Sequence, residues 1–231
     1  GERCFYDEPH FWENGDLFQT NKYVTYGKKW KIWLEKIVIN SENKITIKSI
    51  GSDYHKKIYN KFFNKKIQKN KKILYIPNSF IGEIRVFPYA KFIDPILFDW
   101  QKYLIEVLQK NGFDVIYKKH PKGFLHEENF LGELATYQST KPMLEALEDA
   151  DMVLCDMAGS AFTESLCAGK NIVLIDTLQR PFDFSSKEDL QSAVKIIDAY
   201  WEENTLMIDE KKLIDAFTNF DINKENMKKV V

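Results

Sequence analysis

The chain has 231 residues, 44% hydrophobic and 14% aromatic, which is enough to bury one sizeable core or one core with a smaller lobe. Its formal net charge of −1 excludes strong overall attraction to nucleic acid or anionic lipid, although its lysines could still form a local patch. Three widely spaced cysteines, two of them (Cys155 and Cys167) in strongly apolar segments, are typical of reduced core thiols and favour a cytoplasmic location.

The first seventy residues carry few clear signals. Residues 1–50 are rich in aromatic side chains, and Lys44–Lys48 is strand-like, but no repeating unit is present. Between His55 and Lys72, eight of eighteen residues are lysine, so this stretch predicts a solvated helix or a linker. A patch that faces anionic lipid or a polyanionic acceptor is the less favoured interpretation.

From Lys72 onward, short apolar runs alternate with helical patterns, which indicates a wound α/β domain with a parallel sheet covered on both faces. Its strands are expected at 73–76, 114–118, 151–155 and 171–175. Helices are expected from Asp94, the predicted cap, to 111, at 141–148, at 160–168, from 185 to about 200, and from about 209. Pro95 and Pro142 suit helix starts, Gly169 suits a helix end, and Ser185 with Glu188 forms a capping box.

Polar residues follow three of these strands at the point where each ends. In an open parallel sheet, ligands bind beyond the carboxyl ends of the strands, where loops converge and helix N-termini present free N–H groups. The segments at these ends are Asn78 and Ser79, then 118–123 with Lys119 and His120, then 156–160. They are therefore the candidate binding residues.

His120 follows two lysines and precedes Pro121. Its imidazole could donate a hydrogen bond to a phosphate oxygen or shuttle a proton at neutral pH, and its position at a strand end favours such a function over a structural role. Asp156, also at a strand end, could orient a neighbouring loop, bind an acceptor or cap a turn.

The segment Gly159-Ser160-Ala161 opens a helix, where backbone and hydroxyl can approach a phosphate beside the positive end of the dipole. Glu164 lies four residues after Ser160, on the same helical face, and its carboxylate can accept both hydroxyls of a ribose. An ordinary N-cap and a charge that merely stabilises the dipole are the structural alternatives.

Several other site classes lack support. His126, Glu127 and Glu128 have no second histidine or cysteine at helical ligand spacing, so no metal site is expected. The sequence contains no nucleophile elbow, P-loop or dinucleotide fingerprint. No apolar run approaches the ~18 to 20 residues that a membrane span needs.

Lys119-His120-Pro121 and the stretch 151–176 together resemble the C-terminal domain of GT-B glycosyltransferases, above all teichoic-acid glycerophosphotransferases and capsule or lipopolysaccharide transferases. These families carry a His-Pro pair after a strand, an apolar strand ending in Asp, a loop bearing serine, and a helix with Glu before a Gly-Lys-Pro turn. This order recurs over residues 72–180. Asn171 replaces the usual proline, and Gly159-Ser160-Ala161 replaces paired serines.

The resemblance implies that His120 and Ser160 hold the donor phosphates, that Glu164 lies near the ribose and that Asp156 borders the active cleft. It implies a GT-B donor-binding domain at 72–231, a crossover at 51–71, and in 1–50 the tail of an N-terminal acceptor lobe, so that the chain is a fragment of a longer enzyme. The implied reaction transfers a sugar or polyol phosphate from a cytidine or uridine nucleotide to a glycan or lipid-linked acceptor, with peripheral membrane contact, no nucleic acid and no tightly bound cofactor.

Two rival functions share this fold. One is a nucleotide-binding or scaffold domain without catalysis, and the other is a sugar-nucleotide epimerase or hydrolase.

Overall fold

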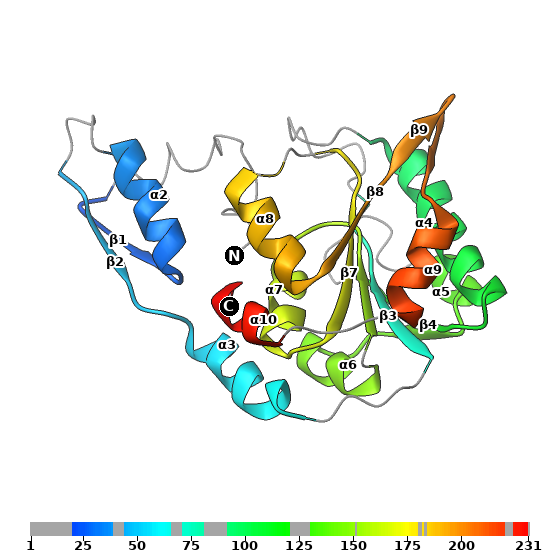
Figure 1. The fold of residues 1–231 in the computed structure, drawn as a ribbon, viewed down its shortest axis with the longest axis horizontal. Coiled ribbons are helices and arrows are strands. Elements are labelled where there is room, and N and C mark those ends of the chain that lie inside the picture. The colour runs from blue at the N-terminus through cyan, green and yellow to red at the C-terminus, as the bar shows by residue number, and fades with distance from the viewer. Residues whose placement is uncertain are drawn as a thin grey trace.

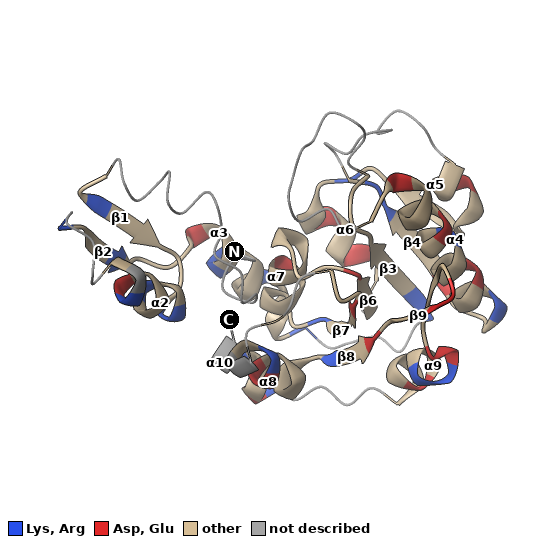
Figure 2. Cartoon of the chain, turned by 90° about the horizontal axis from the view of Figure 1, so that it is seen from above, with Lys and Arg blue, Asp and Glu red and all other residues tan. Residues whose placement is uncertain are grey.

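The computed structural model describes residues 20–38, 44–65, 71–80, 92–120, 130–150, 152–179, 182, 184–219 and 224–230. A small N-terminal unit is followed by a larger α/β body with a six-stranded sheet at its centre (Figure 1). Among the described residues, no helix is long and apolar enough to cross a membrane. Charged side chains of both signs are intermixed over the helices and strands (Figure 2).

The N-terminal unit is a β-α-β arrangement. It consists of β1 (Lys22–Thr25), α2 (Lys28–Val38) and β2 (Thr46–Ser49), and its two strands pair in parallel. Leu34 and Ile47 form its buried centre, with the stacked rings of Trp30 and Trp33 packed against them. Both views set this unit to one side of the larger body (Figures 1 and 2), and an ion pair between Lys29 and Asp189 links the two.

The six-stranded sheet is parallel throughout. Its strands are β3 (Lys72–Ile76), β4 (Asp114–Lys118), β5 (Tyr137–Ser139), β6 (Met152–Cys155), β7 (Asn171–Asp176) and β8 (Lys195–Asp198). Their order in space is β5-β4-β3-β6-β7-β8. The chain therefore starts in the middle of the sheet, builds outward to β5, and returns to build the other half from β6. This order is Rossmann-like, and the point where it reverses lies between β3 and β6.

Helices cover both faces of this sheet. They are α3 (Asp53–Ile58), the π-helix η2 (Tyr59–Phe63), α4 (Asp94–Lys110), α5 (Phe130–Leu134), α6 (Met143–Asp149), α7 (Ser160–Cys167), α8 (Phe184–Ala193), α9 (Glu210–Thr218) and α10 (Lys224–Val230). An antiparallel hairpin of β9 (Tyr200–Glu202) and β10 (Thr205–Met207) precedes α9. The wound α/β class expected from the sequence is confirmed.

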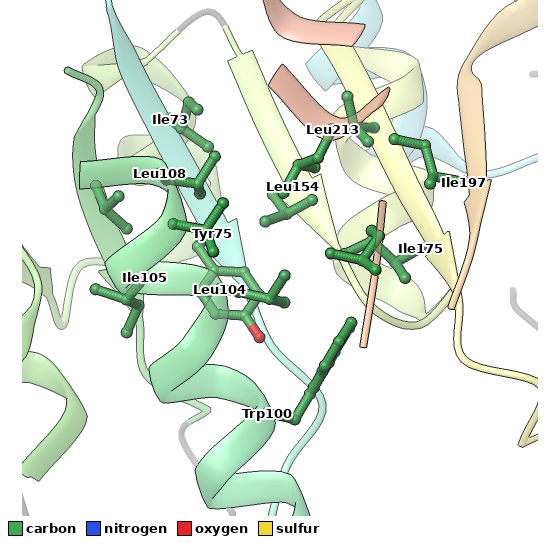
Figure 3. Close-up of a cluster of buried hydrophobic side chains, with 14 of the residues drawn as sticks. Ile73, Tyr75, Trp100, Leu104, Ile105, Leu108, Leu154, Ile175, Ile197 and Leu213 are labelled. Atoms are coloured by element: carbon green, nitrogen blue, oxygen red, sulfur yellow. The ribbon is translucent and has the colours of Figure 1, made fainter. Parts of the chain in front are cut away.

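Alternation along each central strand divides the core into two layers. On β3, Leu74 packs into the cluster beneath α6, α7 and α8, whereas Ile73 and Tyr75 pack into the cluster beneath α4 and α9. Figure 3 shows the second cluster, where Tyr75 and Trp100 lie among the aliphatic side chains. Strands that are apolar on both sides are what a sheet covered on both faces requires.

The lysine-rich segment differs from its expected solvated character. Residues 53–63 are helical, but Ile58, Phe62 and Phe63 are buried against the body. We call α3 and η2 together the joining segment, because they lead from the N-terminal unit into the sheet. Its lysines Lys56, Lys57 and Lys61 are exposed, so a charged composition concealed an amphipathic helix.

The helix expected from 185 to about 200 was wrong in its length. The helix α8 ends at Ala193, and the next residues form the edge strand β8. Leu190, Ala193, Val194 and Ile197 recur at i, i+3, i+4 and i+7 and are all buried, so their spacing fits a continuous helix. Pairing with β7 overrides this local pattern. Strands β5, β9 and β10, each three residues long, were also missed.

The starts of three other helices differ from the expected positions by about one residue. Ile93 rather than Asp94 is the N-cap of α4, Pro142 is the N-cap of α6, and α8 begins before Ser185. Asp151 and the first nineteen residues lie outside the described part of the chain.

Gly169 has a backbone conformation and close neighbours that leave no room for a side chain. Its φ is +66°, and a Cβ there would lie 3.1 to 3.3 Å from atoms of Phe63 in the joining segment. Gly169→Ala should therefore lower the free energy of unfolding by about 1–3 kcal/mol through backbone strain and overpacking. Urea unfolding followed by circular dichroism measures this loss.

Gly112→Ala is the matched control, because its φ is +79° but its nearest neighbour is the flexible end of Lys71 at 3.7 Å. This variant should lower the free energy of unfolding only through backbone strain, by about 1 kcal/mol. Equal losses in the two variants would contradict a packing role for Gly169.

Candidate functional site

The reversal point of the sheet brings the predicted residues to one edge. Because β4 and β6 both pair in parallel with β3, their carboxyl ends meet at the same edge of the sheet. Asn78 and Ser79 follow β3, Lys119 and His120 follow β4, and Asp156 follows β6 and leads into α7. The loop bearing His120 and the helix that opens after Gly159 therefore share this edge, as the sequence predicted.

Asp156 is a buried carboxylate that holds the loop after β3. The side chain is 3% exposed, and its Oδ2 accepts a hydrogen bond of 2.9 Å from the hydroxyl of Tyr75. Its Oδ1 accepts a hydrogen bond from the backbone N–H of Asn78. The indole N–H of Trp100 faces the same carboxyl group, although it forms no hydrogen bond of normal geometry with any described residue. Asp156 thus orients the loop, one of the roles considered for it.

A second set of hydrogen bonds ties the same loop to α4 and β4. Gln101, fully buried, donates from Nε2 to the carbonyl oxygen of Asn78 at 2.8 Å. Its Oε1 accepts from the hydroxyl of Tyr117 at 3.0 Å. The Asn78 side chain in turn accepts from the backbone N–H of Ser79 at 2.9 Å. Hydrogen-bonded from both sides, Asn78 fixes the start of this loop at the reversal point.

The first turn of α7 lies on the other side of the reversal point. Gly159 is its N-cap and has no side chain to cap the first N–H groups. Gly159 is buried, Ala161 is half-buried and Ser160 is exposed. An uncapped helix start with an exposed hydroxyl is suited to contact an anionic group.

Glu164 and Lys118 interact electrostatically at this edge. Burial is the main cause that raises the pKa of Glu164, while contact with the Tyr54 hydroxyl and the charge of Lys118 lower it. Burial lowers the pKa of Lys118, and Glu164 raises it. Lys118 is the last residue of β4 and belongs to the strand-end segment 118–123 expected from the sequence, in which only Lys119 and His120 were singled out.

Lys119 is half-buried and His120 is exposed at the end of β4. Pro121, which completes the His-Pro pair, lies outside the described residues, as do His126, Glu127 and Glu128. In the part of the chain that the structure describes, no group of three or more His, Cys, Asp or Glu side chains could hold a metal ion. Cys155 and Cys167 are buried free thiols, as expected.

A small pocket opens beside Asp156 at the ends of β6 and β7. Its lining residues are Asn78, Asp156, Met157, Ile175, Asp176, Thr177, Gln179 and Phe182. Asp176 is buried and pairs with Lys187 at 2.9 Å. The residues after β7 were not predicted as part of a site, although they too follow the carboxyl end of a parallel strand.

The turn that borders this pocket contains an unusual backbone conformation. Leu178 has a φ of +59°, which costs energy for a residue other than glycine. Its N–H donates to Oδ1 of Asp176 at 3.0 Å, and the carbonyl oxygen of Asp176 accepts from Ala199. The buried carboxylate therefore holds the strained turn in place.

The carboxyl group of Asp156 predicts a specific pH dependence of stability. Burial raises its pKa from 3.8 to about 7, so the folded state binds this proton more tightly than the unfolded chain. The resulting stabilisation is present below about pH 4 and is lost as the pH rises through about 7. The amide side chain of Asp156→Asn cannot ionise. Between pH 4 and 7, the free energy of unfolding of the wild type should therefore fall by on the order of 2–4 kcal/mol relative to this variant.

Urea unfolding at several pH values measures this difference. Asp99→Asn, the same change at an exposed position of α4, is the control and should follow the wild type. The raised pKa of Asp156 is refuted if the difference in free energy of unfolding between wild type and Asp156→Asn does not change with pH. It is also refuted if the wild type becomes the more stable of the two as the pH rises.

No family model matches the chain, and searches of curated proteins and of solved structures found no match either. The structure itself establishes an α/β fold with a six-stranded parallel sheet flanked by helices and a Rossmann-like strand order. Beyond that fold, the function of the chain is inferred from the residues at the reversal point.

Proposed function

We propose that the chain binds a nucleotide-activated donor at the reversal point of its sheet, as the donor-binding part of a GT-B transferase that builds surface polysaccharide or a phosphate-linked cell-wall polymer. One observation carries this proposal. The strand order brings a fixed loop, a basic strand end and an uncapped helix start to a single edge, which is where Rossmann-like sheets bind nucleotides.

The charges at this edge suit a diphosphate. Lys118, Lys119 and His120 follow one strand, and the first turn of α7 with Ser160 supplies N–H groups and a hydroxyl. Together these groups stabilise the negative charge that develops on a departing nucleotide. The half-buried carboxylate of Glu164 is then placed to accept the ribose hydroxyls.

The donor in this proposal is a cytidine or uridine nucleotide that carries a sugar or polyol phosphate. The acceptor is a growing glycan or a lipid-linked polymer, used in the cytoplasm or at the inner face of its membrane. His120 is the proposed acid or base, because it is exposed at the site edge and an imidazole can both donate and accept a proton.

A nucleotide-binding domain without catalysis is the second candidate, and the position of Asp156 favours it. Both oxygens of this carboxylate are occupied, one by the Tyr75 hydroxyl of β3 and the other by the backbone N–H of Asn78 in the loop after β3. A group occupied in this way supports the site without contacting the reacting atoms. Activity assays with the donor and an acceptor distinguish the two candidates, since the second predicts binding without turnover.

Calorimetric titration with cytidine and uridine diphosphates tests the proposal. Replacing His120 by Ala should weaken binding by about 1.5–3 kcal/mol, the range for loss of a charge-assisted hydrogen bond. Guanosine diphosphate and the monophosphates serve as comparison ligands.

Lys195→Ala is the matched control, because Lys195 is exposed at the start of β8, on the opposite edge of the sheet. It also removes a basic side chain but should leave affinity unchanged. If His120→Ala binds as tightly as the wild type, His120 has no phosphate role, and if no nucleotide binds at all, the whole proposal fails.

A further inference from the structure

The small pocket at the ends of β6 and β7 takes no part in the nucleotide contacts proposed above. It shares Asn78 and Asp156 with the reversal point, so it adjoins the candidate site. None of the groups assigned to the phosphates or to the ribose is among its lining residues. The pocket is therefore placed to receive a group that the nucleotide carries.

This pocket offers no positive charge to an anion. Among the described residues that line it, none is Lys or Arg. Asp176 is already paired with Lys187 at 2.9 Å, and Asp156 accepts its hydrogen bonds from a hydroxyl and a backbone N–H, both uncharged. A phosphate or carboxylate in the pocket would meet buried carboxyl groups of its own sign, so the pocket favours an uncharged group.

Gln179 supplies a hydrogen-bond donor to this pocket. It is half-buried, and its side-chain Nε2 is buried without a hydrogen-bond partner in the described part of the chain. Leaving a buried donor unpaired costs free energy, so a ligand that supplies an acceptor forms a bond that the free protein lacks. Thr177 lines the same pocket with a hydroxyl group, which can both donate and accept.

The turn that carries Gln179 is fixed by its neighbours. Leu178, the preceding residue, has a φ of +59°, and its N–H donates to Oδ1 of Asp176 at 3.0 Å. Lys187 on α8 donates to Oδ2 of the same carboxylate at 2.9 Å. A strained backbone conformation persists only where surrounding contacts hold it, and such residues cluster at ligand-binding turns. The turn therefore presents Gln179 to the pocket in a fixed position.

The rest of the lining is apolar and consists of Met157, Ile175 and Phe182. Sugars and polyols carry both C–H groups and hydroxyls, so one such group can satisfy the apolar and the polar lining together. Because the pocket is small, it suits a single hydroxymethyl end rather than a whole sugar ring.

We propose that this pocket binds the hydroxymethyl end of an uncharged sugar or polyol, whose hydroxyl accepts a hydrogen bond from Nε2 of Gln179. The same ligand hydroxyl donates to the hydroxyl oxygen of Thr177. This inference rests on the proposed function and narrows the group that its donor carries. A sugar with a carboxylate in place of the hydroxymethyl group is disfavoured.

Calorimetric titration of the full chain with bare and conjugated nucleotides tests the proposal. The ligands are cytidine diphosphate and its glycerol conjugate, and uridine diphosphate with its glucose and glucuronic acid conjugates. At least one of the two uncharged conjugates should bind the wild type about fivefold or more tightly than its bare nucleotide, as expected for neutral hydrogen bonds. The glucuronic acid conjugate should show no such gain in affinity.

Gln179→Leu removes the donor and keeps a side chain of similar size. This variant should reduce the gain in affinity to about twofold or less and leave the affinity for the bare nucleotide unchanged. Its free energy of unfolding should equal or exceed that of the wild type, because an unpaired buried donor is removed. Gln138→Leu, the same change at a half-buried position on the edge strand β5, is the matched control and should keep the gain.

Three results would overturn the assignment of this pocket and leave the proposed function standing. They are nucleotide binding without a gain for either uncharged conjugate, an equal gain for the glucuronic acid conjugate, and a gain that Gln179→Leu retains. If no nucleotide binds the wild type, the proposed function fails and the inference fails with it.

Discussion

The geometry of the candidate site depends on a buried carboxylate at the reversal point of the sheet. Asp156 has lost nearly all contact with water, and this desolvation is costly unless hydrogen bonds replace the solvent. Tyr75 and the backbone of Asn78 provide those bonds. The carboxylate therefore joins β3, β6 and the loop between β3 and α4, and it sets the shape of the edge on which the candidate site is built.

Much of this architecture follows from local sequence signals. Apolar runs bounded by Pro77, Gly112 and Gly169 predicted four of the six sheet strands, because a parallel sheet buried on both faces needs continuous apolar strands. The strand-end rule then selected Asn78 and Asp156, which do meet at the reversal point. Regular elements with clear turn residues are predictable because each is specified by its own few residues.

The missed features are those that tertiary contacts decide. The helical spacing of apolar residues in α8 continues to Ile197, yet residues 195–198 form strand β8, paired with β7. Tyr54 lies in a lysine-rich segment in which the apolar spacing of Ile58, Phe62 and Phe63 is masked by the surrounding charge. Its contact with Glu164 joins residues far apart in the sequence, so it could be found only after folding had placed α3 against α7.

The last helix, α10, bears on how this protein is made. Lys224 donates a hydrogen bond of 2.6 Å to the carbonyl oxygen of Phe63, and Met227 is fully buried in the layer that also holds Phe63. One wall of the core therefore comes from residues synthesised some 160 positions after the other. During translation, part of the apolar surface of the sheet stays uncovered until α10 has been synthesised. In that period the uncovered surface can aggregate or bind chaperones.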